Sequence, residues 1–381
     1  MIHATRLSAL ALASCLLAAP ALAQTVNLYT TREPALLNPV IDAFTKDTGI
    51  KVNAVFLKDG LQERVAAEGA NSPADVMLMV DVGQINALVD AGITQPIKSA
   101  LVDRTVPAAL RGPADNWVTL TQRARIVVVS KERVKQDAIT YEDLADPKWK
   151  GKVCIRSGQH PYNNAFFAAY LARNGAEKTE NFLKGLKANL ARKPGGGDRD
   201  VARDILSGQC DIAVMNTYYI GLMSEAKNEQ KSWYEAIKPL KSTFANGGTH
   251  VNVSAAAIAR NAPNKDNAVK LIEYMLGDKA QTLYADGNFE FPVNPDVKES
   301  AAVKLLGTIT PDTTPPEESE SDSEVVKEGG RAARWDQSTE SVDRRTVGRF
   351  YLFSLRLSAS RFLSHPSERK SAPPLGHLRQ G

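Results

Sequence analysis

The chain has 381 residues, of which 43% are hydrophobic and 24% are charged, and its formal net charge is +4. A chain of this length allows two domains or one large two-lobed unit, and its composition is that of a soluble globular protein. The charge is small for the length, and no stripe of Lys and Arg with interleaved aromatic residues occurs in the body of the chain. We therefore expect no binding to nucleic acid.

The N-terminus has the pattern of a secretory signal. A basic residue precedes an apolar stretch that ends at Pro20, and "ALA" at 21–23 has the small-x-small form of a signal-peptidase site. The stretch is too short to span a membrane. We expect residues 1–23 to be cleaved, so that the mature chain starts at Gln24. The alternative is a lipoprotein signal, in which the "LASC" motif that ends at Cys15 would tether the protein.

Strand and helix patterns then alternate. The expected strands lie at 25–31, 50–56 and 74–80, and the expected helices at 34–44, 59–71 and 83–91. This β-α-β-α-β order implies a parallel sheet with helices on both faces.

Two long extended stretches follow, "WVTLTQRARIVVVSKE" and "GTHVNVSAAAIAR", and a second β/α set lies between them. Both are longer than a core strand needs, so we interpret them as hinge strands that cross between two lobes. The predicted fold is therefore α/β and periplasmic-binding-protein-like, with two α/β lobes joined by hinge strands. Lobe one comprises 25–124 and 249–300, and lobe two comprises 125–248, which residues 301–316 could join.

Three tyrosines follow strand ends in lobe two. Tyr162 follows the strand that ends at Arg156, and Tyr218 and Tyr219 follow the strand in "CDIAVMN". If these strands are parallel neighbours, the phenols converge at the sheet edge where open α/β folds bind ligands. A phenolate is a hard oxygen donor that suits Fe(III), and a trivalent cation can displace the phenol proton at neutral pH. The alternative is that each tyrosine is an ordinary packing residue.

The two cysteines of the mature chain, Cys154 and Cys210, each lie in a short strand-like segment of lobe two. Export makes a disulfide possible. If the two strands are neighbours, a bridge forms where the Cα atoms are about 4.4–6.8 Å apart. We favour the bridge over two buried free thiols.

Other polar motifs have plainer interpretations. The Gly-rich "KPGGGDRDVARDIL" lacks the features of a phosphate or dinucleotide loop, so we interpret it as a loop with Asp198 capping a helix; the alternative is a peripheral anion contact. His160 is expected to be a solvated loop residue, and the alternative is a hydrogen bond to an anion or a ligand. We find no nucleophile elbow, HExxH motif or paired Cys-His array, so we expect no enzymatic activity.

The chain resembles the periplasmic ferric-iron-binding proteins, the substrate-binding components of bacterial iron ABC transporters, within the transferrin-like two-lobed class. The resemblance runs from about Thr25 to Pro295. It rests on "NLYTTREPALL", "SPADVMLMVD", "ITYEDLADPKWKGKVCIRSGQHPYN", "GGDRDVARDI", "CDIAVMNTYYIG" and "GTHVNVSAAAIA". It implies a periplasmic protein that captures Fe(III) and delivers it to an ABC permease in the inner membrane. We expect a monomer.

The resemblance also implies that Tyr162, Tyr218 and Tyr219 are phenolate ligands of the iron. Three phenolates balance Fe(III), so an added synergistic anion, carbonate or a similar ion, would make the site anionic. Arg32 and Arg123 are the candidate cationic partners of that anion, because a guanidinium pairs with planar oxyanions.

Some relatives carry a His-Tyr pair after the first arginine, where this chain has Glu33 and Pro34. The chain therefore resembles the subgroup with three tyrosines and an anion. The alternative for Arg123 and for Arg125 is a surface or hinge salt bridge. The alternative function is a same-fold binding protein for a polyamine, thiamine or a phosphonate. A secreted hydrolase is disfavoured because no nucleophile–base pair is found.

The end of the chain departs from the family pattern. From Pro311 it is acidic and rich in Pro and Ser, and from Arg331 it is rich in Arg and Ser. This composition predicts a disordered tail at 317–381. The match to the family is lost at about Pro316, which we interpret as a frameshifted or misassembled reading frame; a genuine appended tail is the alternative.

Overall fold

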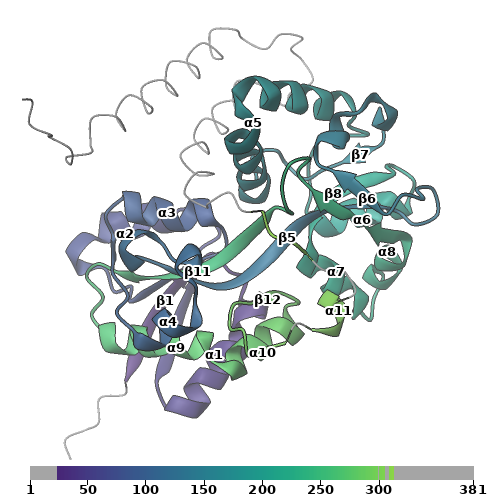
Figure 1. Cartoon of the computed structure of the whole chain (residues 1–381). Coiled ribbons are helices and arrows are strands. Elements are labelled where there is room, and N and C mark those ends of the chain that lie inside the picture. The colour runs from purple at the N-terminus through teal and green to yellow at the C-terminus, as the bar shows by residue number, and fades with distance from the viewer. Residues whose placement is uncertain (1–23, 299, 305–308, 313–381) are drawn as a thin grey trace, which may run out of the picture.

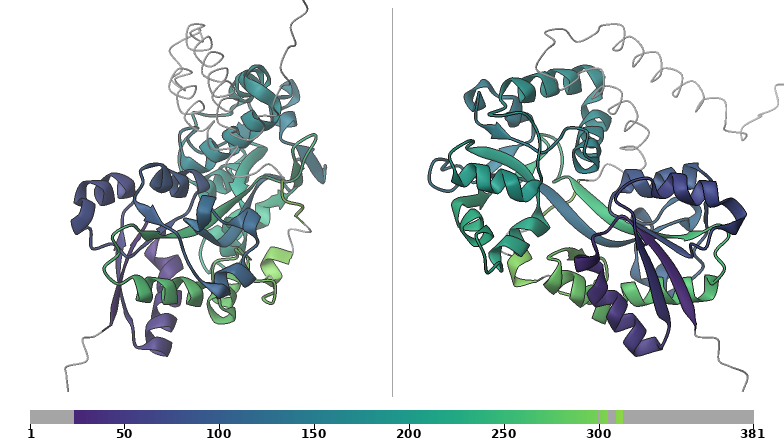
Figure 2. Two further views of the ribbon diagram at one scale, coloured as in Figure 1. Left: turned by 60° about the vertical axis from the view of Figure 1, so that its left-hand side comes forward. Right: turned by 180° about the vertical axis from the view of Figure 1, so that it is seen from behind.

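The computed structural model describes residues 24–298, 300–304 and 309–312 (Figure 1). The predicted signal peptide at 1–23 and the predicted tail at 317–381 lie outside the described residues. The fold consists of two α/β lobes, one on either side of the long strands that cross between them (Figures 1 and 2). This confirms the predicted fold class, whereas the exact lobe boundaries remain a prediction.

Lobe one begins with three parallel strands in the order β2-β1-β3. They are β1 (Thr25–Thr30), β2 (Lys51–Phe56) and β3 (Val76–Met79). The next strand in the sheet, β11 (Val251–Ala259), is antiparallel to β3. The predicted parallel arrangement of the first three strands is therefore confirmed, and β11 joins them in the antiparallel direction because it enters lobe one from the other lobe.

The first helix shows how the sequence specifies these elements. Helix α1 (Pro34–Thr48) begins with a proline, whose fixed φ suits the first helical turn. Its apolar residues recur at helical spacing, and all of them are buried: Leu37, Val40, Ile41 and Phe44. The helix ends before Gly49, which has the left-handed φ of 73° that favours glycine. Two shorter helices, α2 (Leu61–Glu68) and α3 (Val82–Asp90), follow.

Strand β5 (Val118–Ser130) belongs to both lobes. Its first half pairs with β11, and its second half pairs with β8 (Ile212–Asn216) of lobe two. It is buried along almost its whole length. The expected crossing strand is therefore present, and Figure 1 shows β5 and β11 running side by side between the lobes.

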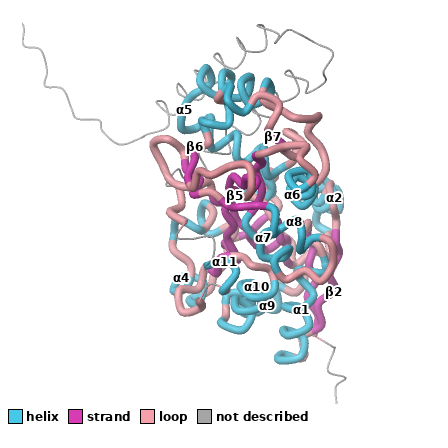
Figure 3. Tube along the Cα trace, turned by 90° about the vertical axis from the view of Figure 1, so that its right-hand side faces the viewer, coloured by secondary structure: helices cyan, strands magenta, loops and turns pink. Residues whose placement is uncertain are grey.

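Lobe two places β7 (Val153–Cys154) parallel to β8, which meets the condition under which the phenols were expected to converge. Its helices are α5 (Pro161–Ala188), α6 (Asp198–Leu206), α7 (Thr217–Ser224) and α8 (Gln230–Ala236). Helix α5 consists of two helical segments that meet at Gly175, where φ is 75°. Seen from the side, strands run through the middle of the molecule with helices outside them (Figure 3).

The remaining elements are short strands and the helices of the C-terminal half. They are β4 (Thr94–Gln95), α4 (Ala100–Thr105), β6 (Ala138–Thr140), β9 (Ile237–Pro239), β10 (Lys241–Thr243), α9 (Lys265–Leu276), α10 (Asp278–Gly287), β12 (Phe291–Pro292) and α11 (Ala301–Lys304). Strand β12 pairs with the middle of β5, so the chain returns to the hinge after lobe one.

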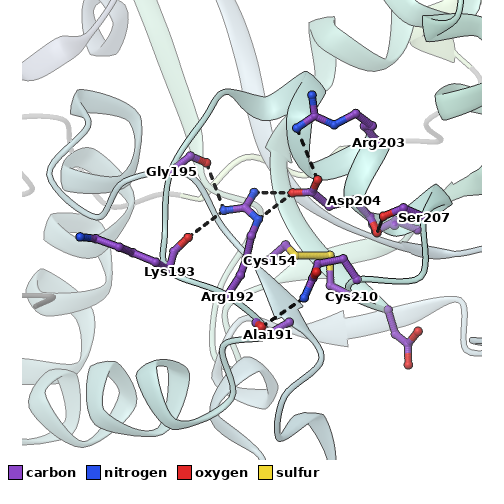
Figure 4. Close-up of a disulfide and its surroundings, with 12 residues drawn as sticks. Cys154, Ala191, Arg192, Lys193, Gly195, Arg203, Asp204, Ser207 and Cys210 are labelled. Carbon is purple, nitrogen blue, oxygen red and sulfur yellow. Dashed lines mark hydrogen bonds and ion pairs between the residues drawn. A yellow bond between two sulfur atoms is a disulfide. The ribbon is translucent and has the colours of Figure 1, made fainter. Parts of the chain in front are cut away.

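Cys154 and Cys210 form a disulfide with a Cα–Cα distance of 5.8 Å, which confirms the predicted bridge (Figure 4). Cys154 is the last residue of β7, and Cys210 lies two residues before β8. The bridge therefore fastens together the two parallel strands that lead into the tyrosine segments.

Removing this disulfide is expected to destabilise the protein markedly. The cysteines are 56 residues apart, and closing a loop of that size restricts the unfolded chain by about 4 kcal/mol. The Cys154→Ala/Cys210→Ala variant should therefore unfold at a lower denaturant concentration than the oxidised wild type. Reductant should lower the wild-type midpoint and leave that of the variant unchanged. Equal midpoints for oxidised and reduced wild type would contradict this expectation.

Candidate metal centre

The three predicted tyrosines lie in the first turns of two helices. Tyr162 is the second residue of α5, and Tyr218 and Tyr219 are the second and third residues of α7. Both helices follow the parallel strands β7 and β8, so their N-termini lie at one edge of the lobe-two sheet. Because Tyr218 and Tyr219 are helical, their side chains are about 100° apart rather than on opposite faces as in a strand. Both can therefore face the same cavity.

The phenols come together as the sequence predicted. The Tyr162 and Tyr218 hydroxyl oxygens are 3.2 Å apart, and the Tyr218 and Tyr219 ring centroids are 4.1 Å apart. All three residues line one cavity of about 320 Å³. The wall opposite them comes from lobe one and includes Arg32 and Lys58. The site thus lies between the lobes.

Burial makes two of these phenols harder to deprotonate. Burial raises the pKa of Tyr218 well above its usual range, and the nearby phenols Tyr162 and Tyr219 raise it further. Burial, followed by the negative charge of Asp198, raises the pKa of Tyr219 to about 12. Tyr218 and Tyr219 are therefore neutral at pH 7 without a metal, and a cation that binds them must displace their protons.

Arg32 lines the cavity, but a carboxylate already occupies most of its guanidinium. Two of its nitrogens pair with the carboxylate of Glu290, and its Nη1 also donates to Ser254 Oγ at 2.9 Å. Arg32 and Glu290 are both buried. For Arg32 to bind an anion as predicted, the Glu290 carboxylate would have to share the Arg32 guanidinium with that anion or release it.

Arg123 is less fully engaged. Its Nη2 donates to the Val80 carbonyl, and its buried Nη1 has no hydrogen-bond partner within the described part of the chain. Its guanidinium carbon lies 5.4 Å from the Tyr162 ring centroid. Arg123 therefore has an N–H available beside the phenols, and its place at an anion stays a prediction.

Two expectations about neighbouring residues are wrong. Asp198 does not cap α6: the N-cap is Gly197, and Asp198 is a fully buried helical residue bound to Arg125 and Arg156. His160 is not a freely solvated residue, since it is half-buried and its Nδ1 accepts a hydrogen bond from the Tyr162 amide at 3.2 Å. It caps the helix that carries Tyr162.

The chain returning from lobe one also contacts the tyrosine helix. Phe289 has a left-handed φ of 57°, which is uncommon for a residue other than glycine, and it packs against Tyr218. The Phe289 ring fits against Gly221 of α7, where an added Cβ would lie 2.2 Å from the Phe289 Cγ. The small residue at 221 is thus required by this close approach.

Gly221→Ala is accordingly expected to destabilise the protein, because overpacking a closed contact costs about 1–3 kcal/mol. Gly287→Ala is the matched control, since no atom lies within 4 Å of the added Cβ there. Chemical denaturation should show a loss of stability for the first variant only. Equal midpoints for the two variants would show that Phe289 can move aside freely.

The protein family can be established by comparison with known proteins. A family model described as "Bacterial extracellular solute-binding protein" matches residues 29–282. The chain belongs to this family. Its members bind solutes rather than catalyse reactions, and extracellular solute-binding proteins work with ABC transporters.

Individual relatives agree with this assignment. This solute-binding protein is 40% identical over 294 residues to iron uptake protein A1 of Synechocystis sp. (strain ATCC 27184 / PCC 6803 / Kazusa). The aligned region covers 76% of this chain and 82% of that protein. It is similar to the solved Bordetella ferric binding protein, with 56% identity and a TM-score of 0.74, covering 80% of this chain and 97% of the other. It is also similar to the solved structure described as Trichodesmium (IdiA) (FutA) in complex with iron and citrate ligands, with 34% identity and a TM-score of 0.76. That match covers 82% of this chain and 100% of the other. The resemblance to ferric-iron-binding proteins is confirmed.

Two further findings concern the described residues of this solute-binding protein. Within 24–298, 300–304 and 309–312, no three His, Cys, Asp or Glu side chains gather as they would around a metal ion. The tyrosine cluster is thus the candidate metal centre. None of the helices in these ranges has the length and apolar character needed to cross a membrane.

The sequence prediction missed Arg156 and Arg199 of the solute-binding protein. The guanidinium carbon of Arg156 lies 5.0 Å from the Tyr162 ring centroid, and that of Arg199 lies 4.9 Å from the Tyr219 ring centroid. Arg156 also lowers the pKa of Tyr219, although burial outweighs this effect. The position of Arg156 at a strand end could have indicated it, but Arg199 reaches Tyr219 only through the folding of the Gly-rich loop.

Proposed function

We propose that this protein captures Fe(III) in the periplasm through the phenolates of Tyr162, Tyr218 and Tyr219 and delivers it to an ABC importer. The observation that carries the proposal is the convergence of three phenols in one cavity between the lobes. Phenolate oxygens are hard donors, and a trivalent ion supplies the free energy needed to remove protons from buried phenols. Relatives described as ferric-binding proteins support the same cargo.

A synergistic anion, carbonate or a similar ion, would complete the iron coordination. The anion needs cationic partners, and Arg123 supplies an unpaired Nη1 beside Tyr162. Arg32 lies in the same cavity, where it would approach the anion once the contact with Glu290 loosens. The relative with bound iron and citrate shows that this fold can hold iron together with an organic anion.

The position of the cavity supports a cycle of capture and closure. Lobe two carries the phenols, and lobe one carries Arg32 and Lys58 on the facing wall. Closure about β5 and β11 would bring these cations over the metal and its anion and exclude water. We propose that the protein acts as a monomer, reaches the periplasm through cleavage of residues 1–23, and releases iron upon docking to the permease.

The alternative is a binding protein of the same fold for a polyamine, thiamine or a phosphonate, and it is not favoured. A polyamine could approach the exposed carboxylates of Glu33 and Asp59, since Glu290 is bound to Arg32, but it would leave the three adjacent phenols without a role. A phosphonate could use the arginines, but it would leave the three adjacent phenols without a role.

The proposal is tested by the colour of the purified protein. Titration with ferric citrate should produce a red-orange phenolate-to-iron charge-transfer band that saturates at one iron per chain. A thermal-shift panel should show strong stabilisation by ferric citrate and little by spermidine, thiamine or 2-aminoethylphosphonate. If the protein stays colourless and one of these solutes stabilises it instead, the proposed function is wrong.

A further inference from the structure

A fully buried carboxylate lies behind the tyrosines. Asp198 is 0% exposed and accepts three hydrogen bonds from different parts of lobe two. They come from Arg125 Nη1 at 3.1 Å, from Arg156 Nη1 at 3.2 Å and from the Asn216 amide at 2.8 Å. A carboxylate so deeply buried is stable only when paired in this way.

Arg125 extends this cluster to the other tyrosine segment. It lies on the hinge strand β5, and its Nε and Nη2 both donate to Asn163 Oδ1, at 3.0 and 2.6 Å. Its Nη1 also donates to Asn216 Oδ1 at 2.8 Å. Asn163 in turn donates to the carbonyls of Arg156 and Ser157, both at 3.0 Å.

These contacts reach both metal-binding segments. Asn163 directly follows Tyr162, and Asn216 is the N-cap of the helix that carries Tyr218 and Tyr219. The parallel ladder between β7 and β8 contains only two residue pairs and ends at Cys154, eight residues before Tyr162. The ladder alone therefore cannot fix the distance between the phenols, whereas the Asp198 cluster connects both segments directly.

The cluster also sets the charge around the phenols. One carboxylate is shared by two guanidinium groups, so the group carries a net positive charge, and Arg156 lies 5.0 Å from the Tyr162 ring centroid. Removing the charge of Asp198 would leave two buried cations without a counter-ion, and their repulsion would displace the segments attached to them.

We propose that Asp198, acting with Arg125, is the positioning residue that holds the three phenolate oxygens at the spacing Fe(III) requires. The inference rests on the proposed function and adds to it a residue that does not bind the metal but sets the spacing of the tyrosines that do. Outer partners of metal ligands typically account for about 10–100-fold in metal affinity.

The same helix offers a matched control. Asp204 of α6 is also buried and also binds two arginines, Arg192 at 2.7 Å and Arg203 at 3.5 Å (Figure 4). None of these residues lines the cavity. Asp198→Asn and Asp204→Asn therefore both remove a buried carboxylate charge from α6, but only the first affects the tyrosine segments.

The experiment compares full-length wild type with both variants after loading from ferric citrate. We expect both variants to lose stability in denaturant. Asp198→Asn should also weaken iron binding by about 10–100-fold in competition with citrate and shift the charge-transfer band, because the phenolate geometry changes. Asp204→Asn should match the wild type in affinity and band position. Equal affinity and an unchanged band for Asp198→Asn would overturn the inference.

A second variant keeps the test decisive if Asp198→Asn does not fold. Asn163→Ala keeps the Asp198 carboxylate but removes the side chain that links Arg125 to the Tyr162 segment and to the Arg156 and Ser157 carbonyls, and it should likewise weaken binding and shift the band. If it behaves as wild type, the inference is wrong. A wild-type protein that never colours overturns the proposed function and this inference together. A coloured wild type with unaffected variants overturns the inference alone.

Discussion

Replacing Tyr218 and Tyr219 with phenylalanine is expected to abolish ferric-iron binding while leaving the fold intact. The double variant removes two of the three hard oxygen donors, so the loss should exceed the ~10–100-fold that follows loss of an outer partner. Each substitution deletes a single oxygen atom. The Tyr218 hydroxyl bonds to that of Tyr162, a contact worth about 1 kcal/mol, so the cost in stability should be small.

Equilibrium dialysis against ferric citrate and the visible spectrum would measure this loss. Tyr170→Phe is the matched control, because Tyr170 is equally buried in lobe two but stacks on Phe182 away from the cavity. It should bind iron as the wild type does. Iron binding by the double variant at wild-type affinity would remove the tyrosines from the proposed site.

The second large effect that we expect is a steep rise of iron affinity with pH. The pKa of Tyr219 is raised to about 12 and that of Tyr218 lies well above its usual range, both chiefly through burial. Both phenols are therefore protonated in the metal-free protein at neutral pH, and both lose their protons to the metal. These two released protons alone make the apparent affinity increase at least about 100-fold per pH unit, and it falls by the same factor as pH decreases.

The cavity residue His160 does not obscure this slope. Burial, followed by the charge of Arg156, lowers the pKa of His160 to about 3, so this residue stays neutral between pH 6 and 8. The slope would be measured by competition with a chelator, corrected for the protonation of the chelator itself. Tyr219→Phe should reduce the slope by a factor of about ten per pH unit, because one proton fewer is released. A slope that does not change in this variant would show that Tyr219 is not deprotonated by the metal.

The pattern of the sequence was sufficient to predict the main strands of the two lobes, the hinge and the tyrosine cluster. Apolar runs bounded by turn residues predicted β1, β3 and β8, and the length of β5 predicted its crossing between lobes. The tyrosines could be predicted because they follow strand ends by few residues, so local chain direction places them. The parallel pairing of β7 and β8 then brings the two segments to one edge.

The contacts that depend on distant parts of the chain could not be predicted. Arg32 meets Glu290, which is 258 residues away, so no local pattern indicates that its guanidinium is occupied. Asp198 has the position expected of a helix cap, yet tertiary packing directs its carboxylate to Arg125 and Arg156 instead. The direction of β11 could not be predicted, because strand periodicity carries no information about direction.

The most direct test of the account is a crystal structure of the iron-loaded protein with anomalous data collected at the iron absorption edge. The account predicts one anomalous peak in the cavity between the lobes, within bonding distance of the phenolate oxygens of Tyr162, Tyr218 and Tyr219. Density for a planar anion should lie beside it, toward Arg123. A peak elsewhere in the molecule, or iron held without these three oxygens, would contradict the central claim.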